Sequence, residues 1–295
     1  MTDQGGGLWE RYSLASARIP FQLKVAAVWV ALFVLLAGFF ALSQFDTEWM
    51  KENFSFIAKG IRYTLQIALG GIVIAIVLAL LGALARLSRN PIAYGVAGFY
   101  VSFFRGTPLI VQMFLIYLAL PQIGHNLVER YPGLGTNVEQ RLILSTIVAG
   151  TLALGLNYGA YMTEIFRAGI QSVAHGQGEA ADALGMTYWT KMRRVVLPQA
   201  MRVIIPPTGN EFIAMMKDSA LVSFLGSVVA TAEIFRRAQL VGKADFKNLE
   251  SYVLAAGMYW GLTVVFTFFQ SRLEARMATG YVRDVKLPRG TGGNH

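Results

Sequence analysis

Long apolar runs alternate along the chain with short polar stretches. Four of these runs contain no Asp, Glu, Lys or Arg: Val25–Phe45, Tyr63–Ala85, Leu142–Thr163 and Ser251–Ser271. Each has about the 20 residues that a helix needs to cross a bilayer, where every backbone polar group must be satisfied inside the helix. The pattern therefore predicts four membrane-spanning helices.

Two further apolar stretches are interrupted by charged residues. Pro91–Leu120 is interrupted at Arg105, and Ile204–Ile234 is interrupted at Glu211 and at Lys217-Asp218. Arg105 is followed by Gly106, Thr107 and Pro108, and proline removes a backbone donor, so we expect the helix to kink or break there. Counting both stretches as spans predicts an all-α membrane protein built as a six-helix transmembrane bundle.

The first apolar run and the basic residues set the expected topology. Val25–Phe45 is longer than the ~7–15-residue core of a signal peptide, so we interpret it as a retained helix. With the N-terminus in the cytoplasm, more Lys and Arg fall in inner than in outer loops, as the positive-inside rule requires. Both termini are therefore expected in the cytoplasm, although a basic cluster at residues 236–247 on the outer side weakens the bias.

Composition supports a membrane protein. The chain is 55% hydrophobic and 15% charged, with a mean hydropathy of +0.48, whereas soluble domains carry about 25% charged residues. The net charge of +9 could indicate nucleic acid, but the basic residues flank apolar spans and are explained by topology, so no nucleic-acid partner is expected. The absence of cysteine excludes disulfides and thiol chemistry, and three scattered histidines indicate no metal site.

The longest inner loop, residues 171–202, has the pattern of two short helices. Residues 179–184 are good helix formers, and Gly185 follows where a helix C-terminus needs a left-handed residue. A second helical run, Tyr188–Val196, places Trp189, Met192 and Val196 on one face, and Pro198 is expected to end it. We call this predicted two-helix loop the coupling elbow. Periodicity alone leaves open whether it docks on a soluble partner or rests on lipid as an amphipathic hairpin.

Several spaced motifs carry a resemblance to a known family. The Glu179-Ala180-Ala181 triplet, Gly185 four residues later and Leu197-Pro198 match the EAA signature of permease subunits of bacterial ABC importers. The chain resembles the polar amino acid branch of that family from about Phe56 to Ala278. The further matching motifs are RGTP at Arg105–Pro108, EIFRAGIQSV at Glu164–Val173, GQGEAADALGM at Gly176–Met186, LPQAMRVIIPP at Leu197–Pro207 and KDSALVS at Lys217–Ser223.

The resemblance implies a multi-protein importer of the bacterial inner membrane. The elbow would be the coupling helix that docks in a cleft of a separate ABC ATPase dimer, and the chain itself has no G-x-x-x-x-G-K-[ST] phosphate loop. ATP would be bound by that partner, with no cofactor and no catalytic residue on this chain. Other implied partners are an extracytoplasmic amino-acid-binding protein and a second permease subunit, in a homodimer or heterodimer. The implied coupling residues are Glu179, Ala180, Ala181, Asp182, Gly185, Leu197 and Pro198.

The polar ends, the first apolar run and the extent of the resemblance together predict four parts of the chain. Residues 1–23 form a cytoplasmic N-terminal segment, 24–45 an extra transmembrane helix, 56–278 the importer transmembrane domain and 279–295 a cytoplasmic tail. Many members of this branch have five spans, so the sixth departs from the family pattern and its role is open.

Polar residues inside the apolar spans are candidates for the translocation pathway, because charges in hydrocarbon face the protein interior or a water-filled route. In one interpretation Lys217 and Asp218 line the substrate pathway. In the other they hold their helix against neighbouring helices or a partner subunit. Arg105 binds a substrate carboxylate or has a structural role, which we favour. The complete candidate set is Arg105, Asn157, Tyr161, Asn210, Lys217 and Asp218.

Three other classes of protein compete with this interpretation. An ion-gradient-driven secondary amino acid transporter is the main alternative, and it would act without partner chains. An intramembrane enzyme needs a nucleophile with a base or a metal motif such as H-E-x-x-H, and neither is present. A purely structural subunit does not account for the coupling elbow.

Overall fold

The structure, a computed structural model, describes residues 20–134 and 136–278, and the secondary structure of that part of the chain is helical throughout. The chain divides into two compact units, Met1–Lys51 and Glu52–His295. Most of the predicted N-terminal segment, the tail 279–295 and His295 lie outside the described residues.

The first unit contains α2, Phe21–Leu42, which agrees with the predicted first span to within a few residues. Pro20 precedes α2, and the Ser43 hydroxyl donates to the Phe39 carbonyl at its end (2.8 Å). The helix is apolar on all sides. A second helix, α3 (Thr47–Ala58), begins in this unit, where Asp46 Oδ1 accepts a hydrogen bond from the Trp49 amide (3.0 Å).

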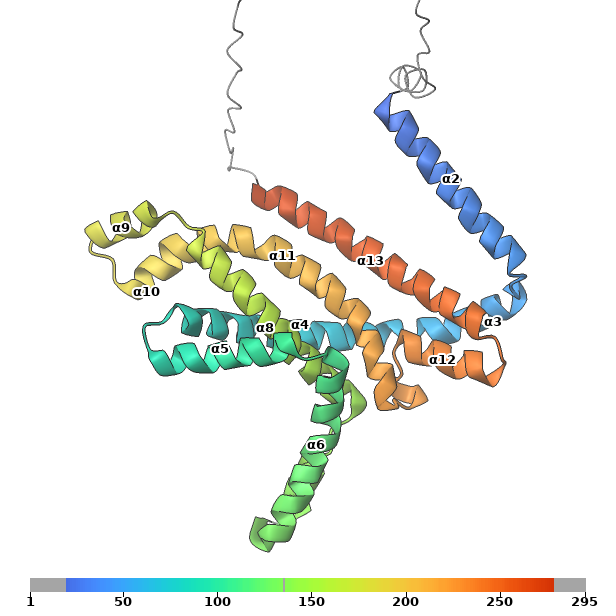
Figure 1. The fold of residues 1–295 in the computed structure, drawn as a ribbon, viewed down its shortest axis with the longest axis horizontal. Coiled ribbons are helices and arrows are strands. Elements are labelled where there is room, and N and C mark those ends of the chain that lie inside the picture. The colour runs from blue at the N-terminus through green and yellow to red at the C-terminus, as the bar shows by residue number, and fades with distance from the viewer. Residues whose placement is uncertain (1–19, 135, 279–295) are drawn as a thin grey trace, which may run out of the picture. The chain divides into compact units, whose positions relative to one another are not determined.

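The second unit is the helical bundle that contains both candidate sites. Its coupling-elbow helices, α9 and α10, lie at the opposite end of the unit from α12 (Figure 1). The main helices of this unit are α4 (Ile61–Leu87), α5 (Pro91–Gly106), α6 (Leu109–Arg130), α8 (Thr146–Gln171), α11 (Leu197–Asp218) and α13 (Asn248–Ala278). Shorter helices are η1 (Pro132–Leu134), α7 (Thr136–Leu142), α9 (His175–Ala183), α10 (Tyr188–Lys191), η2 (Met192–Val196), η3 (Ser219–Leu225), η4 (Val229–Thr231) and α12 (Ile234–Ala244).

Four stretches of the described residues are long and apolar enough to cross a membrane: Phe21–Leu42, Thr47–Leu87, Leu109–Arg130 and Asn248–Met277. Helix α8 is long enough, but it carries many polar and small residues. The total of six spans stays a prediction. One predicted boundary is wrong, because the span expected to begin at Leu142 begins at Thr146, after Ser145, whose hydroxyl accepts from the Val148 amide (3.4 Å).

Two predicted spans are divided in the structure. Pro91–Leu120 is not one helix, since α5 ends at Gly106 and α6 begins at Leu109, with Thr107 and Pro108 extended between them. The expected break at the proline is therefore confirmed, and the two helices run in different directions (Figure 1). The stretch predicted at Ile204–Ile234 also ends early, because Gly226 adopts a left-handed φ of 81° after η3.

The core of the second unit is the contact between α4 and α8, the most extensive in the molecule. Small residues allow it: a Cβ at Gly155 would lie 2.7 Å from the Ile74 side chain, and one at Gly159 would lie 3.0 Å from Leu78. The spacing Gly155-x-x-x-Gly159 is thus a packing feature. The similar pair Gly257 and Gly261 meets no neighbouring atom within 4 Å.

A second apolar cluster joins Ile57, Ile234, Ala238, Ala255 and Met258 near α12. Beside it, Arg237 is buried and its guanidinium donates to the carbonyls of Ala232 (2.9 Å), Val229 (2.9 Å) and Phe56 (3.3 Å). Part of the outer basic cluster that weakened the topology signal is therefore used to hold backbone together.

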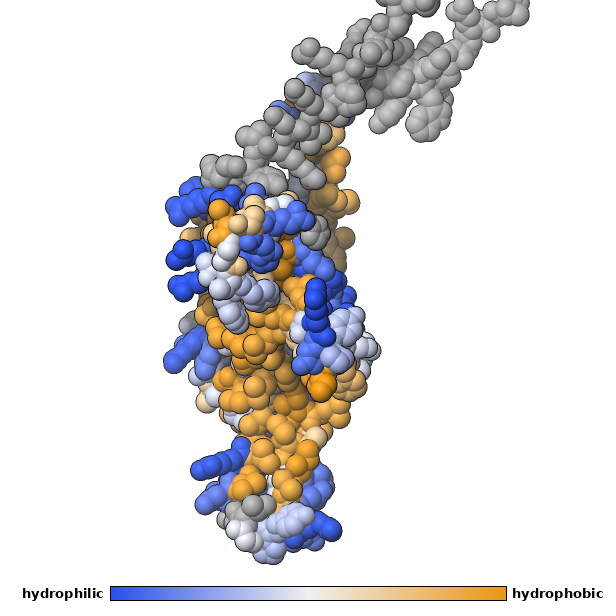
Figure 2. Space-filling model, turned by 90° about the vertical axis from the view of Figure 1, so that its left-hand side faces the viewer, coloured by the Kyte–Doolittle hydropathy of each residue, from blue (hydrophilic) through white to orange (hydrophobic). Residues whose placement is uncertain are grey.

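The surface of the second unit agrees with a membrane setting. Apolar side chains gather in the middle of the face in Figure 2, with polar side chains above and below them. Such a belt is what a bilayer requires of the surface that it covers.

Candidate functional site

The first leg of the coupling elbow is α9, which ends in a hydrogen-bonded Schellman turn. Gly185 has φ of 71°, its amide donates to Asp182 O (2.9 Å), and the Met186 amide donates to Ala181 O (3.1 Å). This pattern satisfies carbonyls that the helix end would otherwise leave free, and it needs a left-handed residue at position 185. The predicted stop at Gly185 is confirmed.

The second leg differs from the prediction at Pro198. Thr187 caps α10, its hydroxyl accepting from the Thr190 amide (3.4 Å), but the helix does not end before the proline. It passes through the π-helical turn η2 directly into α11, with Pro198 in the first turn of α11. A π turn changes the hydrogen-bond register, and proline is tolerated in a first helical turn because no donor is needed there. The second leg is therefore continuous with α11.

An ion pair joins the two legs. Lys191 Nζ of α10 donates to both carboxylate oxygens of Asp182 in α9, at 2.7 and 2.8 Å. Ala181 of α9 and Met192 of η2 are both buried, and α9 contacts η2. The angle between the legs is thus fixed by the Schellman turn, this pair and a small apolar contact.

The outer surface of the elbow is partly apolar. Trp189 is 71% exposed, so it does not share a face with the buried Met192, contrary to the prediction. Its neighbour Tyr188 and Leu184, at the end of the first leg, are also exposed. Of the predicted coupling residues, Ala181 is buried and Leu197 half-buried. The exposed ones are Glu179, Ala180, Asp182, Gly185 and Pro198.

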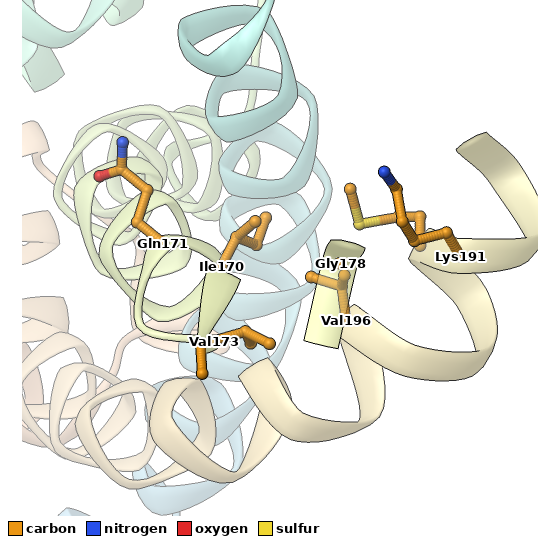
Figure 3. Close-up of a pocket in the computed structure, with 8 residues that line it drawn as sticks. Ile170, Gln171, Val173, Gly178, Lys191 and Val196 are labelled. Carbon is orange, nitrogen blue, oxygen red and sulfur yellow. The ribbon is translucent and has the colours of Figure 1, made fainter. Parts of the chain in front are cut away.

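A hollow of about 460 Å³ separates the elbow from the end of α8. Ile170, in the last turn of α8, and Val173, just after that helix, point toward the side where Gly178 and Val196 of the elbow lie (Figure 3). The hollow leaves space between the elbow and the bundle.

The second candidate site lies where α5 ends. The guanidinium of Arg105 stacks over the ring of Tyr161 in α8, with 5.2 Å from Cζ to the ring centroid, and both residues are exposed. Within the described residues Arg105 forms no ion pair with Asp218 or with any other acid. Its charge remains available on the surface.

A buried amide pair holds the break between α5 and α6. Gln112 Nε2 donates to the carbonyls of Phe104 (2.9 Å) and Thr107 (3.0 Å), and Asn157 Nδ2 donates to Phe104 O and Gln112 Oε1, both at 3.0 Å. These bonds satisfy carbonyls that the broken helix frees. Asn157 is therefore a structural residue here. The sequence analysis did not identify Gln112 as a site residue. A glutamine in the apolar part of α6 was the signal that could have indicated it.

Tyr158 of α8 and the acids of α11 form the other part of this site. The buried Tyr158 donates its hydroxyl to Asp218 Oδ2 (2.8 Å), and Glu211 lies two turns earlier on the same helix. Glu211 and Asp218 are half-buried, and neither pairs with a base in the described part of the chain. Tyr158 was missed because sequence spacing does not show which ring reaches α11.

The two remaining candidates do not join this cluster. Asn210 Oδ1 accepts from Gln270 Nε2 of α13 (2.9 Å), which makes it a contact between α11 and α13. The side chain of Lys217 is exposed and, in the described residues, forms neither an ion pair nor a hydrogen bond. We define the pathway face as Arg105, Tyr161, Tyr158, Asp218 and Glu211.

Neither site has the composition of a metal centre. In residues 20–134 and 136–278, no three His, Asp or Glu residues lie close enough to hold a metal ion.

The family follows from a direct comparison. Residues 71–279 match the family of binding-protein-dependent transport system inner membrane components, and the chain belongs to that family. It is thus the membrane-spanning permease subunit of an ATP-driven ABC importer, a multi-pass inner-membrane transport component, and not a secondary transporter.

Similar proteins cover most of the chain. A probable amino-acid permease protein of Bacillus subtilis is 34% identical over 240 residues, covering 81% of this chain and 99% of its own. An arginine transport system permease protein of Corynebacterium glutamicum is 36% identical over 264 residues, with 86% and 81% covered. The crystal structure of an amino acid ABC transporter with histidines matches with a TM-score of 0.67 and 35% identity, covering 79% of this chain and 99% of that one.

Proposed function

We propose that this permease carries polar amino acids inward and is driven by a separate ABC ATPase dimer that docks on the coupling elbow. The observation that carries the proposal is the geometry of the elbow: a left-handed turn at Gly185 and the Asp182–Lys191 ion pair fix two legs that expose Trp189 and Tyr188. The substrate class rests on the relatives, which are named as amino-acid and arginine permeases.

The second leg gives the elbow a mechanical connection to the bundle. Because α10, η2 and α11 form one continuous helical path, a movement of Tyr188–Lys191 is carried along α11 toward Asp218. In this proposal, ATP binding closes the partner ATPases, moves the elbow and rotates the bundle between inward-open and outward-open states. ATP is bound by the partner, and this chain needs no cofactor and catalyses no hydrolysis.

The pathway face is the proposed route of the substrate. A charged side chain in the hydrocarbon costs about 2.5–3.5 kcal/mol on insertion scales, so unpaired Arg105, Glu211 and Asp218 require water or a partner protein in front of them. A second permease subunit, identical or different, would enclose that water. A zwitterionic substrate has a carboxylate for Arg105 and an ammonium group for the acids.

An extracytoplasmic binding protein would deliver the amino acid, with both termini of the permease in the cytoplasm. The test is reconstitution in proteoliposomes with the partner ATPase and binding protein, screening the common amino acids for uptake and for stimulated ATP hydrolysis. We expect both activities only when all partners are present. Uptake by the purified chain alone would contradict the proposal, as would an unchanged rate in Glu179→Lys.

A further inference from the structure

A charged cluster lies where the end of α4, the start of α5 and the last turns of α8 meet. We call Arg86, Glu164 and Arg167 the Glu164 cluster. Glu164 Oε2 accepts from Arg167 Nε (2.9 Å) and Nη2 (2.6 Å), and Arg167 Nη1 donates to Gln171 Oε1 (2.7 Å). Glu164 and Arg167 therefore form an ion pair, in which one carboxylate oxygen of Glu164 accepts both hydrogen bonds from Arg167.

The other side of the cluster is incomplete. Arg86 Nε is buried and has no hydrogen-bond acceptor, although Glu164 Oε1 lies 3.8 Å away. Hydrogen bonds of this kind measure about 2.7–3.2 Å, so the contact is too long by less than one ångström. Buried donors are almost always satisfied, and a donor without an acceptor calls for an explanation.

Arg86 itself is held in place on the α5 side. Its guanidinium stacks over the ring of Tyr94, at 4.5 Å from the centroid, and a Cβ at Gly98 would lie 3.2 Å from Arg86 Nη1. Arg86 thus lies in α4 and packs against α5, whereas Glu164 and Arg167 lie in α8. A shift of α8 against α4 and α5 would open or close the contact.

Helix α8 leads directly into the coupling elbow. It ends at Gln171, the partner of Arg167, and α9 begins at His175. Gln171 also lines the hollow between α8 and the elbow, which leaves space for the elbow to move (Figure 3). Helix shifts of about 1–2 Å are typical of switching between packed states, and such a shift is enough to close the 3.8 Å contact.

We infer that Arg86 and Glu164 are positioning residues of the coupling step. Their contact closes to a hydrogen-bonded ion pair in one state of the transport cycle and opens in the other, so it joins the elbow end of α8 to α4 and α5. This inference rests on the proposed coupling function. It assigns a role to the only buried arginine nitrogen that lacks an acceptor among the described residues.

The test measures uptake per ATP hydrolysed in proteoliposomes containing the complete importer, with the amino acid that most stimulates hydrolysis. Arg86→Met keeps an apolar stem and removes the charge, and Glu164→Gln removes the other charge. We expect each to lower the ratio about tenfold, the change that roughly 1.4 kcal/mol produces in an equilibrium. Arg86→Lys restores a charged donor and is expected to recover most of the ratio.

The matched control is Arg89→Met, an exposed arginine three residues away, which is expected to behave as wild type. The amount of ATPase that co-purifies with each variant reports folding and assembly. An unchanged ratio in Arg86→Met, with Gly185→Val uncoupled, overturns this inference and leaves the proposed function intact. If neither Arg86→Met nor Gly185→Val changes the uptake per ATP hydrolysed, both this inference and the proposed coupling function are overturned. Failure of Arg86→Lys to recover would assign Arg86 to packing and overturn the ion-pair role.

Discussion

The coupling elbow and the pathway face differ in whether their charged side chains form ion pairs. In the elbow, where water is expected, Asp182 and Lys191 pair with each other and the turn at Gly185 is fully hydrogen-bonded. On the pathway face, where lipid or a water-filled route is expected, Arg105, Glu211 and Asp218 form no ion pair in the described part of the chain.

The Asp182 and Lys191 charges of the elbow therefore neutralise each other, whereas those of the pathway face are not neutralised within the described residues. The elbow keeps its shape without help and exposes Trp189 and Tyr188, which suits rigid docking to a soluble protein. The pathway face leaves charges that are costly in a bilayer, and in the proposed function water, substrate or a second permease subunit covers them. Breaking the two regions should therefore have different results: loss of coupling for the elbow and loss of substrate transport for the face.

Gly185→Val is expected to have the largest effect. A β-branched residue at φ of 71° is strained, by about 1–2 kcal/mol or more, and it breaks the turn that ends α9. ATP-driven uptake should fall by roughly tenfold or more, with the permease still inserted in the membrane. Gly176→Ala is the control, because its Cβ meets open space and its φ is ordinary. Equal uptake in both variants would show that the turn geometry is not required.

Asp218→Asn comes next and addresses the pathway face. The amide can still accept the hydrogen bond from Tyr158, so the variant removes mainly the charge. We expect uptake to fall about tenfold, because hydrogen bonds to charged groups contribute about 1.5–3 kcal/mol. Basal ATP hydrolysis should not change, which distinguishes this variant from Gly185→Val. Asn210→Ser, on the α13 side of α11, serves as the control, and a larger loss there than in Asp218→Asn would contradict the assignment.

Gln112→Leu tests the buried amide pair at the break between α5 and α6. The substitution leaves the carbonyls of Phe104 and Thr107 with fewer donors, and leaving a buried polar group unsatisfied costs about 1–3 kcal/mol. The thermal midpoint of the detergent-solubilised protein should fall. Gln122→Leu, also in α6 but exposed, is the control. No change in the midpoint would mean that the amide pair does not stabilise the break.

The smallest effect is expected for the Asp182–Lys191 pair. Asp182 is 57% exposed, and exposed ion pairs contribute about 0.2–1 kcal/mol. Lys191→Met should reduce coupling only a few-fold, and the reversed pair Asp182→Lys with Lys191→Asp should restore it. A reversed pair as defective as the single variant would contradict a role for the pairing itself.

The sequence predicted the features that depend on local rules. Apolar runs located both ends of α4 and the start of α13 to within a few residues, although α13 runs on to Ala278, past the predicted end at Ser271. The proline rule predicted the break before Leu109, and the glycine rule predicted the turn at Gly185. Each of these features follows from backbone sterics or from the thickness of a bilayer. None of them depends on which residues are neighbours in space.

The errors came from contacts between helices and from altered helical registers. The π turn at residues 192–196 carries the helix past Pro198, which the proline rule alone does not predict. Tyr158, Gln112 and Arg86 were missed because spacing shows which face a side chain occupies but not which helix faces it. Trp189 was placed on the packed face for the same reason.

The most direct test of the coupling role is site-specific photo-crosslinking from the elbow. A benzophenone amino acid at position 189, in place of the exposed Trp189, should crosslink to the ATPase subunit of the assembled importer, in a yield that changes when ATP is added. The same probe at Ile143, exposed between α7 and α8, should give no such product. Crosslinks from position 189 to lipid alone, unaffected by ATP, would contradict the account.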